Sequence, residues 1–87
     1  MYLEFQLPTG AGGMAAQYTS SLLGRNLTAW SNRYNIRYAT KIHKYTVRVT
    51  FDQDEIYSFF AMTWQPVSDK MLDYLLNYRL IEPMNRV

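Results

Sequence analysis

The residues best suited to bind an anion gather in the middle of the chain. Between positions 25 and 48 every charged side chain is basic, whereas acidic residues predominate from position 49 onward. Such asymmetry is typical of a surface that contacts an anionic partner, but the two regions can also neutralise each other within the fold. The sequence leaves both interpretations open. The basic residues of this segment are Arg25, Arg33, Arg37, Lys41, Lys44 and Arg48.

Aromatic rings accompany these cations. We expect Tyr57 and Phe59 to lie beside Lys44 and Arg48 on one face of a sheet, where rings flanked by cations can stack on nucleic-acid bases. No RNP signature is present. Alternatively, a helix, another strand or a second copy of the chain covers these rings. The predicted partner-binding residues are Arg37, Tyr38, Lys41, Lys44, Arg48, Tyr57 and Phe59.

A glycine-rich loop is a second candidate for contact. Gly10, Gly12 and Gly13 lie between a predicted strand and a predicted helix, a context in which glycines let the backbone approach a phosphate. However, no Lys-Ser or Lys-Thr pair follows them, and no acidic residue lies about 20 positions later to hold a ribose. The loop is therefore expected to be a flexible connection or a mobile segment that orders against a partner.

Groups for catalysis or metal binding are sparse. The chain has no cysteine, and His43 is its single histidine. Asp52, Asp54 and Glu55 crowd one turn without the wider spacing and glycine of a calcium loop, and no hydroxyl nucleophile stands in a catalytic motif. We therefore expect a non-catalytic protein without a metal or cofactor.

Hydrophobic periodicity predicts the first elements that position these residues. Leu3, Phe5 and Leu7 alternate with polar positions, as in a half-buried strand. Residues 14–34 contain no proline and carry apolar residues at helical spacing, which predicts a helix. The apolar stripe shifts at Gly24, so this glycine either bends one helix or separates two.

The parity of apolar positions reverses near His43. The apolar residues before this point, Ile36, Tyr38 and Ile42, stand at even positions, whereas odd positions are apolar from 45 to 51. A β-bulge near His43 and Lys44 would reconcile the two halves in one strand and align Arg37, Lys41, Lys44 and Arg48. Without the bulge, residues 36–42 form a separate strand or loop and the basic stripe is broken.

The remaining pattern completes a small α+β fold. A polar turn at 52–55 precedes a predicted strand over 56–64, and Ser68 is a suitable N-cap for a helix that ends near Arg79. The predicted order is β-α-β-β-α, a sandwich in which two helices pack on a three-stranded, mainly antiparallel sheet. We expect a single domain over 1–87, ordered from about residue 2 to residue 82 and followed by a short tail.

Two functional classes remain. The short, cysteine-free, tyrosine-rich chain is similar in length and composition, though not in any motif, to the accessory proteins that bacteriophages encode against host machinery. This resemblance implies a small protein-binding inhibitor of a host nucleic-acid-handling complex. The alternative is direct binding of RNA or single-stranded DNA.

The beginning of the chain does not resemble a signal peptide and no run approaches the ~20 apolar residues of a membrane span, so we expect a cytoplasmic protein without membrane contact. Self-association through a free strand edge is also possible.

Overall fold

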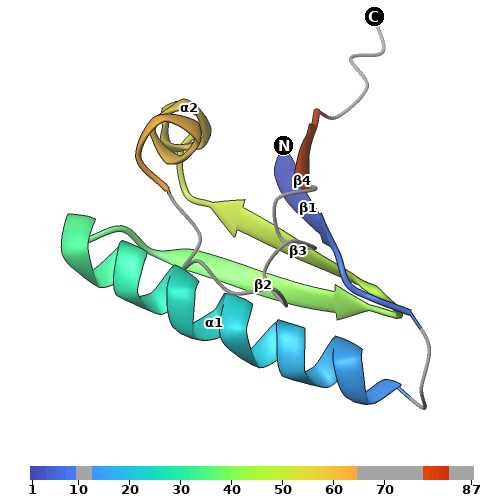
Figure 1. Ribbon diagram of the computed structural model, residues 1–87. Helices are drawn as coiled ribbons and strands as arrows, with labels where there is room; N and C mark the ends of the chain where they lie inside the picture. Colours follow the sequence, from blue (N-terminus) through green and yellow to red (C-terminus); the bar gives the residue numbers. More distant parts are fainter. Residues whose placement is uncertain (10–12, 65–77, 83–87) are drawn as a thin grey trace, which may run out of the picture.

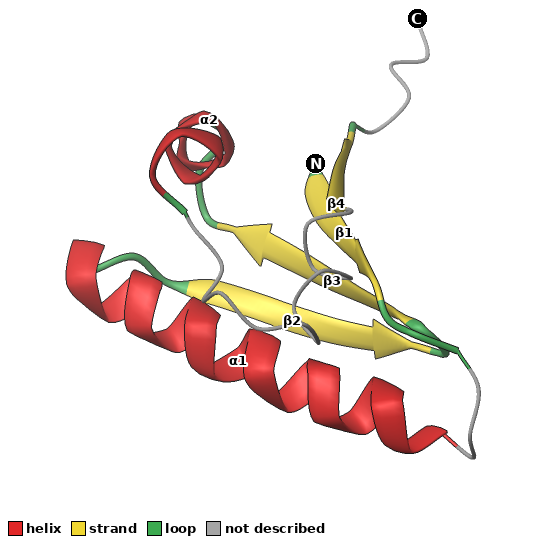
Figure 2. Cartoon of the chain, in the orientation of Figure 1, coloured by secondary structure: helices red, strands yellow, loops and turns green. Residues whose placement is uncertain are grey.

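The computed structural model describes residues 1–9, 13–64 and 78–82. Two helices and one antiparallel sheet make up the described chain, which confirms the α+β class (Figure 1). The sheet has four strands rather than the predicted three, in the order β2-β3-β1-β4 (Figure 2). The elements are β1 (Tyr2–Gln6), α1 (Met14–Tyr34), β2 (Tyr38–His43), β3 (Thr46–Phe51), α2 (Glu55–Thr63) and β4 (Tyr78–Ile81).

One face of the sheet is buried against both helices. Leu3 pairs with Val49 and Phe5 with Val47, so these four side chains share a face, and all are buried. The ring of Phe60 on α2 lies 6.4 Å from that of Phe5 and 5.0 Å from that of Trp30 on α1. Since the rings of both helices meet the same strands, the core is a single cluster and the opposite sheet face is left to the other side chains.

The long helix is confirmed over its full predicted length. α1 runs from Met14 to Tyr34 and passes through Gly24 without interruption, so this glycine does not separate two helices. The helix ends at Asn35, whose left-handed backbone (φ 54°, ψ 47°) directs its N–H to the carbonyl of Ser31. Asparagine is one of the few non-glycine residues that adopt this conformation readily.

The predicted bulge near His43 is wrong, because the chain folds back there into a hairpin. His43 pairs with Thr46, and Lys44 and Tyr45 form the turn between β2 and β3. Lys44 has a positive φ of 55°, which supplies the reversal without glycine. This register places Ile42 opposite Val47. The apolar positions therefore change from even to odd because they belong to two paired strands, β2 and β3, that bury the same face of the sheet.

The predicted strand over 56–64 is also wrong. Residues Glu55–Thr63 form α2, in which Tyr57 and Phe60 are buried, as is Trp64 after its end. These three residues recur at the spacing of one helical face. Residues 56–64, which would be apolar on both faces of a strand, therefore form an amphipathic helix.

The end of the predicted C-terminal helix is a strand. Its proposed start at Ser68 and its body lie outside the described residues, as does the predicted tail. Tyr78 and Arg79, however, belong to β4, which pairs antiparallel with β1. β4 therefore adds the fourth strand and places Arg79 opposite Glu4.

Candidate functional site

A row of charged side chains crosses the sheet on the face away from the helices. Lys41 of β2 pairs with Arg48 of β3, Arg48 pairs with Glu4 of β1, and Glu4 pairs with Arg79 of β4. Residues opposite each other in an antiparallel sheet project from the same side. We call this side the outer face, and we call Lys41, Arg48, Glu4 and Arg79 the charged row.

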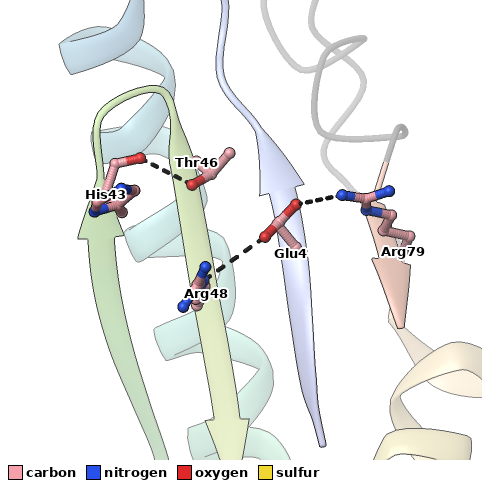
Figure 3. A network of polar contacts seen from close by, with 5 residues as sticks. All are labelled: Glu4, His43, Thr46, Arg48 and Arg79. Carbon is pink, nitrogen blue, oxygen red and sulfur yellow. Dashed lines mark hydrogen bonds and ion pairs between the residues drawn. The ribbon is translucent and has the colours of Figure 1, made fainter. Parts of the chain in front are cut away.

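Glu4 holds the centre of the charged row. Its Oε1 accepts a hydrogen bond from Arg79 Nη2 at 3.0 Å, and its Oε2 lies 3.7 Å from Arg48 Nε (Figure 3). The Glu4 side chain is only 13% exposed, whereas that of Arg79 is 73% exposed. One carboxylate therefore faces two guanidinium groups and leaves the charged row with a surplus of positive charge.

Arg48 is less exposed than Arg79 and contacts an aromatic ring. Its guanidinium carbon lies 4.9 Å above the ring of Tyr2, a cation–π geometry. Its Nε is buried and has no hydrogen-bond partner among the described residues, because the distance to Glu4 is too long for one. The side chain is nevertheless part-exposed. Arg48 thus presents a fixed positive charge in the middle of the sheet.

The rest of the outer face adds no acid in the described strands, and it includes the pair Tyr2 and Ile81 as well as polar residues. Gln6 pairs with Thr46, which pairs with His43 in the next row toward the hairpin turn. Thr46 Oγ1 donates a hydrogen bond to the His43 carbonyl at 2.8 Å (Figure 3). Glu4 is the only acidic residue among the outward-facing positions of the four described strands. The two described helices pack on the opposite face, so neither of them covers the charged row.

Two of the predicted contact residues meet on the outer face, for a reason that differs from the prediction. Lys41 and Arg48 are neighbours across two strands instead of members of one bulged strand. Lys44 is exposed in the turn, and Arg37 is exposed in the connection between α1 and β2. Tyr38 faces the helices, where its hydroxyl lies 2.9 Å from Thr28 Oγ1.

The two predicted stacking rings do not lie on the outer face. Tyr57 is buried in α2 at 4% exposure; its hydroxyl donates to the Met1 carbonyl at 2.7 Å and accepts from the Phe51 N–H at 3.0 Å. The ring of Phe59 packs edge-on against Tyr34 at 4.9 Å. Both positions follow from the helical conformation of 55–63, which turns these rings toward α1 and the end of β3.

The glycine loop is described only at its end. Gly10 and Gly12 lie outside the described residues. Gly13 precedes α1 with a φ of 80°, a left-handed conformation that favours glycine. Its place at the start of the helix agrees with a connecting role.

The sequence did not predict that three further residues belong to the outer face of the sheet, namely Tyr2, Glu4 and Arg79. Their proximity to Arg48 depends on which strands pair and in what register, and Arg79 lay in a segment predicted as helix. The alternation of residues 2–7 does place Tyr2 and Glu4 on the exposed side of the first strand. This was the available signal, but it does not say which strand lies next to β1.

Other kinds of site have little support in the described chain. No group of three or more His, Cys, Asp or Glu residues is placed to hold a metal ion in residues 1–9, 13–64 and 78–82. Neither described helix combines the length and the hydropathy of a membrane span. Comparison of the chain with protein-family models, with curated proteins and with solved structures gave no match.

Proposed function

We propose that this chain is a non-catalytic protein-interaction module that binds an acidic surface of a partner protein through its charged row. The observation that carries the proposal is the direct opposition of Lys41 and Arg48 across β2 and β3. Like charges at such a position destabilise a sheet by up to about 1 kcal/mol. Glu4 lies on the far side of Arg48 from Lys41, so it is not placed between the two cations. An acidic partner would relieve their repulsion.

The placement of aromatic rings favours a protein over a nucleic acid. Nucleic-acid-binding sheets expose rings on which bases stack. On the outer face the ring of Tyr2 is already covered by the Arg48 guanidinium, and Tyr57 and Phe59 lie on the helical side. These features support recognition of carboxylates held on a folded surface.

The extent of the row suits a small, transient interface. Neighbouring strands are about 4.8 Å apart, so a row across four strands spans roughly 14 Å. Contacts of this size form the centre of an interface rather than all of it. A module of this kind acts by occupying its partner's surface. An inhibitor of a larger complex, including one that handles nucleic acid, belongs to the same proposal.

Affinity capture with a charge variant tests the proposal. The tagged chain is compared with the double variant Lys41→Glu plus Arg79→Gln in extracts of the native host. We avoid Arg48, because a change there would also remove its contact with the ring of Tyr2. Loss of two interfacial cations should lower recovery of the partner by about tenfold or more.

A matched double variant controls for net charge. Arg25→Glu plus Arg33→Gln alters two exposed cations of α1 and changes the net charge equally. It should retain the partner. If both double variants capture the same proteins in the same amounts, the charged row is not the binding surface. A different outcome is binding of single-stranded RNA with an affinity that falls steeply as salt rises. If only Lys41→Glu plus Arg79→Gln abolishes that binding, the charged row is a nucleic-acid-binding surface.

A further inference from the structure

The free edge of β2 has the features of a second contact site. Among the described strands, β2 is the outermost of the sheet and has only β3 as a neighbour. Every residue of β2 after Tyr38 is exposed, and Ile42 is 60% exposed although it faces the helical side. Alternate N–H and C=O groups of such an edge point away from the sheet, where they can pair with another strand.

A groove of about 410 Å³ lies between this edge and α1. Leu7 and Ala16 line the groove but are themselves buried, so its exposed apolar side chain is that of Ile42, beside Lys44 of the hairpin turn. From the helix, Ser20 and Ser21 line it with short side chains. The groove can therefore receive apolar side chains from a strand placed beside β2.

Gly24 lies near the same flank of the helix, one turn beyond Ser20 and Ser21. A Cβ at this position would meet no atom within 4 Å, and its φ is not in the left-handed region. Neither packing nor backbone conformation within the described chain thus requires glycine here, although glycine in a helix costs about 1 kcal/mol relative to alanine. Open space along this flank is consistent with room for an additional segment.

The charges around the edge specify the kind of segment. Lys41 projects from β2 on the outer face, Lys44 follows it in the turn, and Arg37 precedes it; all three are exposed. No acidic residue occurs between Arg25 and Phe51. A strand placed beside β2 would therefore be favoured if it carried acidic side chains on the outer face and apolar side chains on the groove side.

We infer that β2 binds an extended peptide segment with alternating acidic and apolar residues as a fifth strand of the sheet. Backbone hydrogen bonds along the edge hold the segment, and alternate side chains give specificity. The inference rests on the proposed function, for which it names the part of the partner that binds. A second copy of the chain is disfavoured as the occupant, because its own β2 carries Lys41 and no acid.

A synthetic peptide tests the inference directly. The probe is the acetylated, amidated peptide EVEVEVEV, titrated into the full chain by calorimetry at low salt. We expect saturable binding that is absent for the charge-inverted peptide KVKVKVKV. Two further probes carry N-methyl groups on all glutamates or on all valines. Because only one set of amides faces β2, one methylated peptide should bind and the other should not. Equal binding of both methylated peptides and the parent would overturn the inference.

Matched variants locate the site on the chain. Ile42→Glu places an acid at the mouth of the groove and should weaken binding of EVEVEVEV by about tenfold or more. Met62→Glu makes the same type of change on α2, where Met62 is 84% exposed, and should leave binding unchanged. Equal affinities in the two variants would overturn the inference. So would a dimer in sedimentation that Ile42→Glu dissociates, if the peptide also fails to bind, because a second copy would then occupy the edge.

The partner captured from the host separates this inference from the proposed function. If Ile42→Glu still captures the partner but Lys41→Glu plus Arg79→Gln does not, the charged row binds the partner and the edge-strand inference fails. If the double variant Lys41→Glu plus Arg79→Gln retains the partner, the proposed function itself fails. Loss of the partner in both variants, with capture by Met62→Glu unchanged, is the result that we expect.

Discussion

At the scale of single residues, Glu4 reduces the positive charge of the charged row. Its carboxylate pairs with Arg79 and approaches Arg48, so it neutralises part of the positive charge on the outer face. These pairs are part-exposed, and such pairs contribute only about 0–1 kcal/mol to stability. Under the proposed function, we therefore expect Glu4 to influence partner binding more than folding.

Replacement of Glu4 by glutamine should separate these two roles. Glu4→Gln removes the only acid of the charged row but keeps the size of the side chain. We expect the free energy of unfolding to fall by less than about 1 kcal/mol and affinity for an acidic partner to rise. Urea denaturation and calorimetry with the captured partner measure the two effects. Weaker binding by a variant that remains folded would show that Glu4 itself contacts the partner.

Tyr57 is a structural residue whose hydroxyl joins three parts of the chain. It accepts from the N–H at the end of β3 and donates to the carbonyl that precedes β1. Tyr57→Phe would leave the buried N–H of Phe51 without this partner, and we expect a loss of about 1–3 kcal/mol in unfolding free energy. Urea denaturation measures it.

Tyr45→Phe is the matched control for this change. Tyr45 lies exposed in the hairpin turn, so removal of its hydroxyl should alter stability by less than about 0.5 kcal/mol. Equal stability of the two variants would mean that the Tyr57 hydroxyl bonds contribute nothing net to folding.

At the scale of elements, α1 contains one glycine that its conformation does not require, Gly24, and is preceded by one that it does, Gly13. Gly24→Ala should stabilise the fold by about 0.5–1 kcal/mol, since alanine is the better helix former and the added Cβ meets nothing. Gly13→Ala should destabilise it by about 1 kcal/mol, because Gly13 has a φ of 80°. Thermal unfolding followed by circular dichroism measures both. Destabilisation by Gly24→Ala would show that the space beside this residue is filled in the folded protein.

Elements with one clear pattern could be predicted, and those compatible with two patterns could not. The alternation of β1 has one interpretation, and the proline-free segment of α1 is helical in each of its interpretations, which differ only in whether Gly24 divides it. Residues 56–64 are apolar at both strand and helix spacing, and only packing of Phe60 against Phe5 and Trp30 decides between them. The hairpin was missed because its turn contains no glycine; Lys44 adopts the positive φ instead.

At the scale of the whole molecule, the charged row is a product of topology. Glu4 and Arg79 are separated by most of the chain, and they meet because β4 joins the sheet beside β1. The basic character of the middle segment is visible in the sequence, but the register that unites Lys41, Arg48, Glu4 and Arg79 is not. Tyr57 and Phe59 were assigned to the wrong face for a different reason, because the segment that carries them was predicted as a strand and is a helix.

The central claim is that the outer face of the sheet binds an acidic partner, and the most direct measurement is NMR mapping of that contact. The isotopically labelled chain is titrated with the captured partner, and perturbation of each backbone amide is recorded. The largest perturbations should fall on Glu4, Lys41, Arg48 and Arg79, with little change on the exposed side of α1. Perturbations concentrated on α1 and α2, with those four amides unchanged, would contradict the claim.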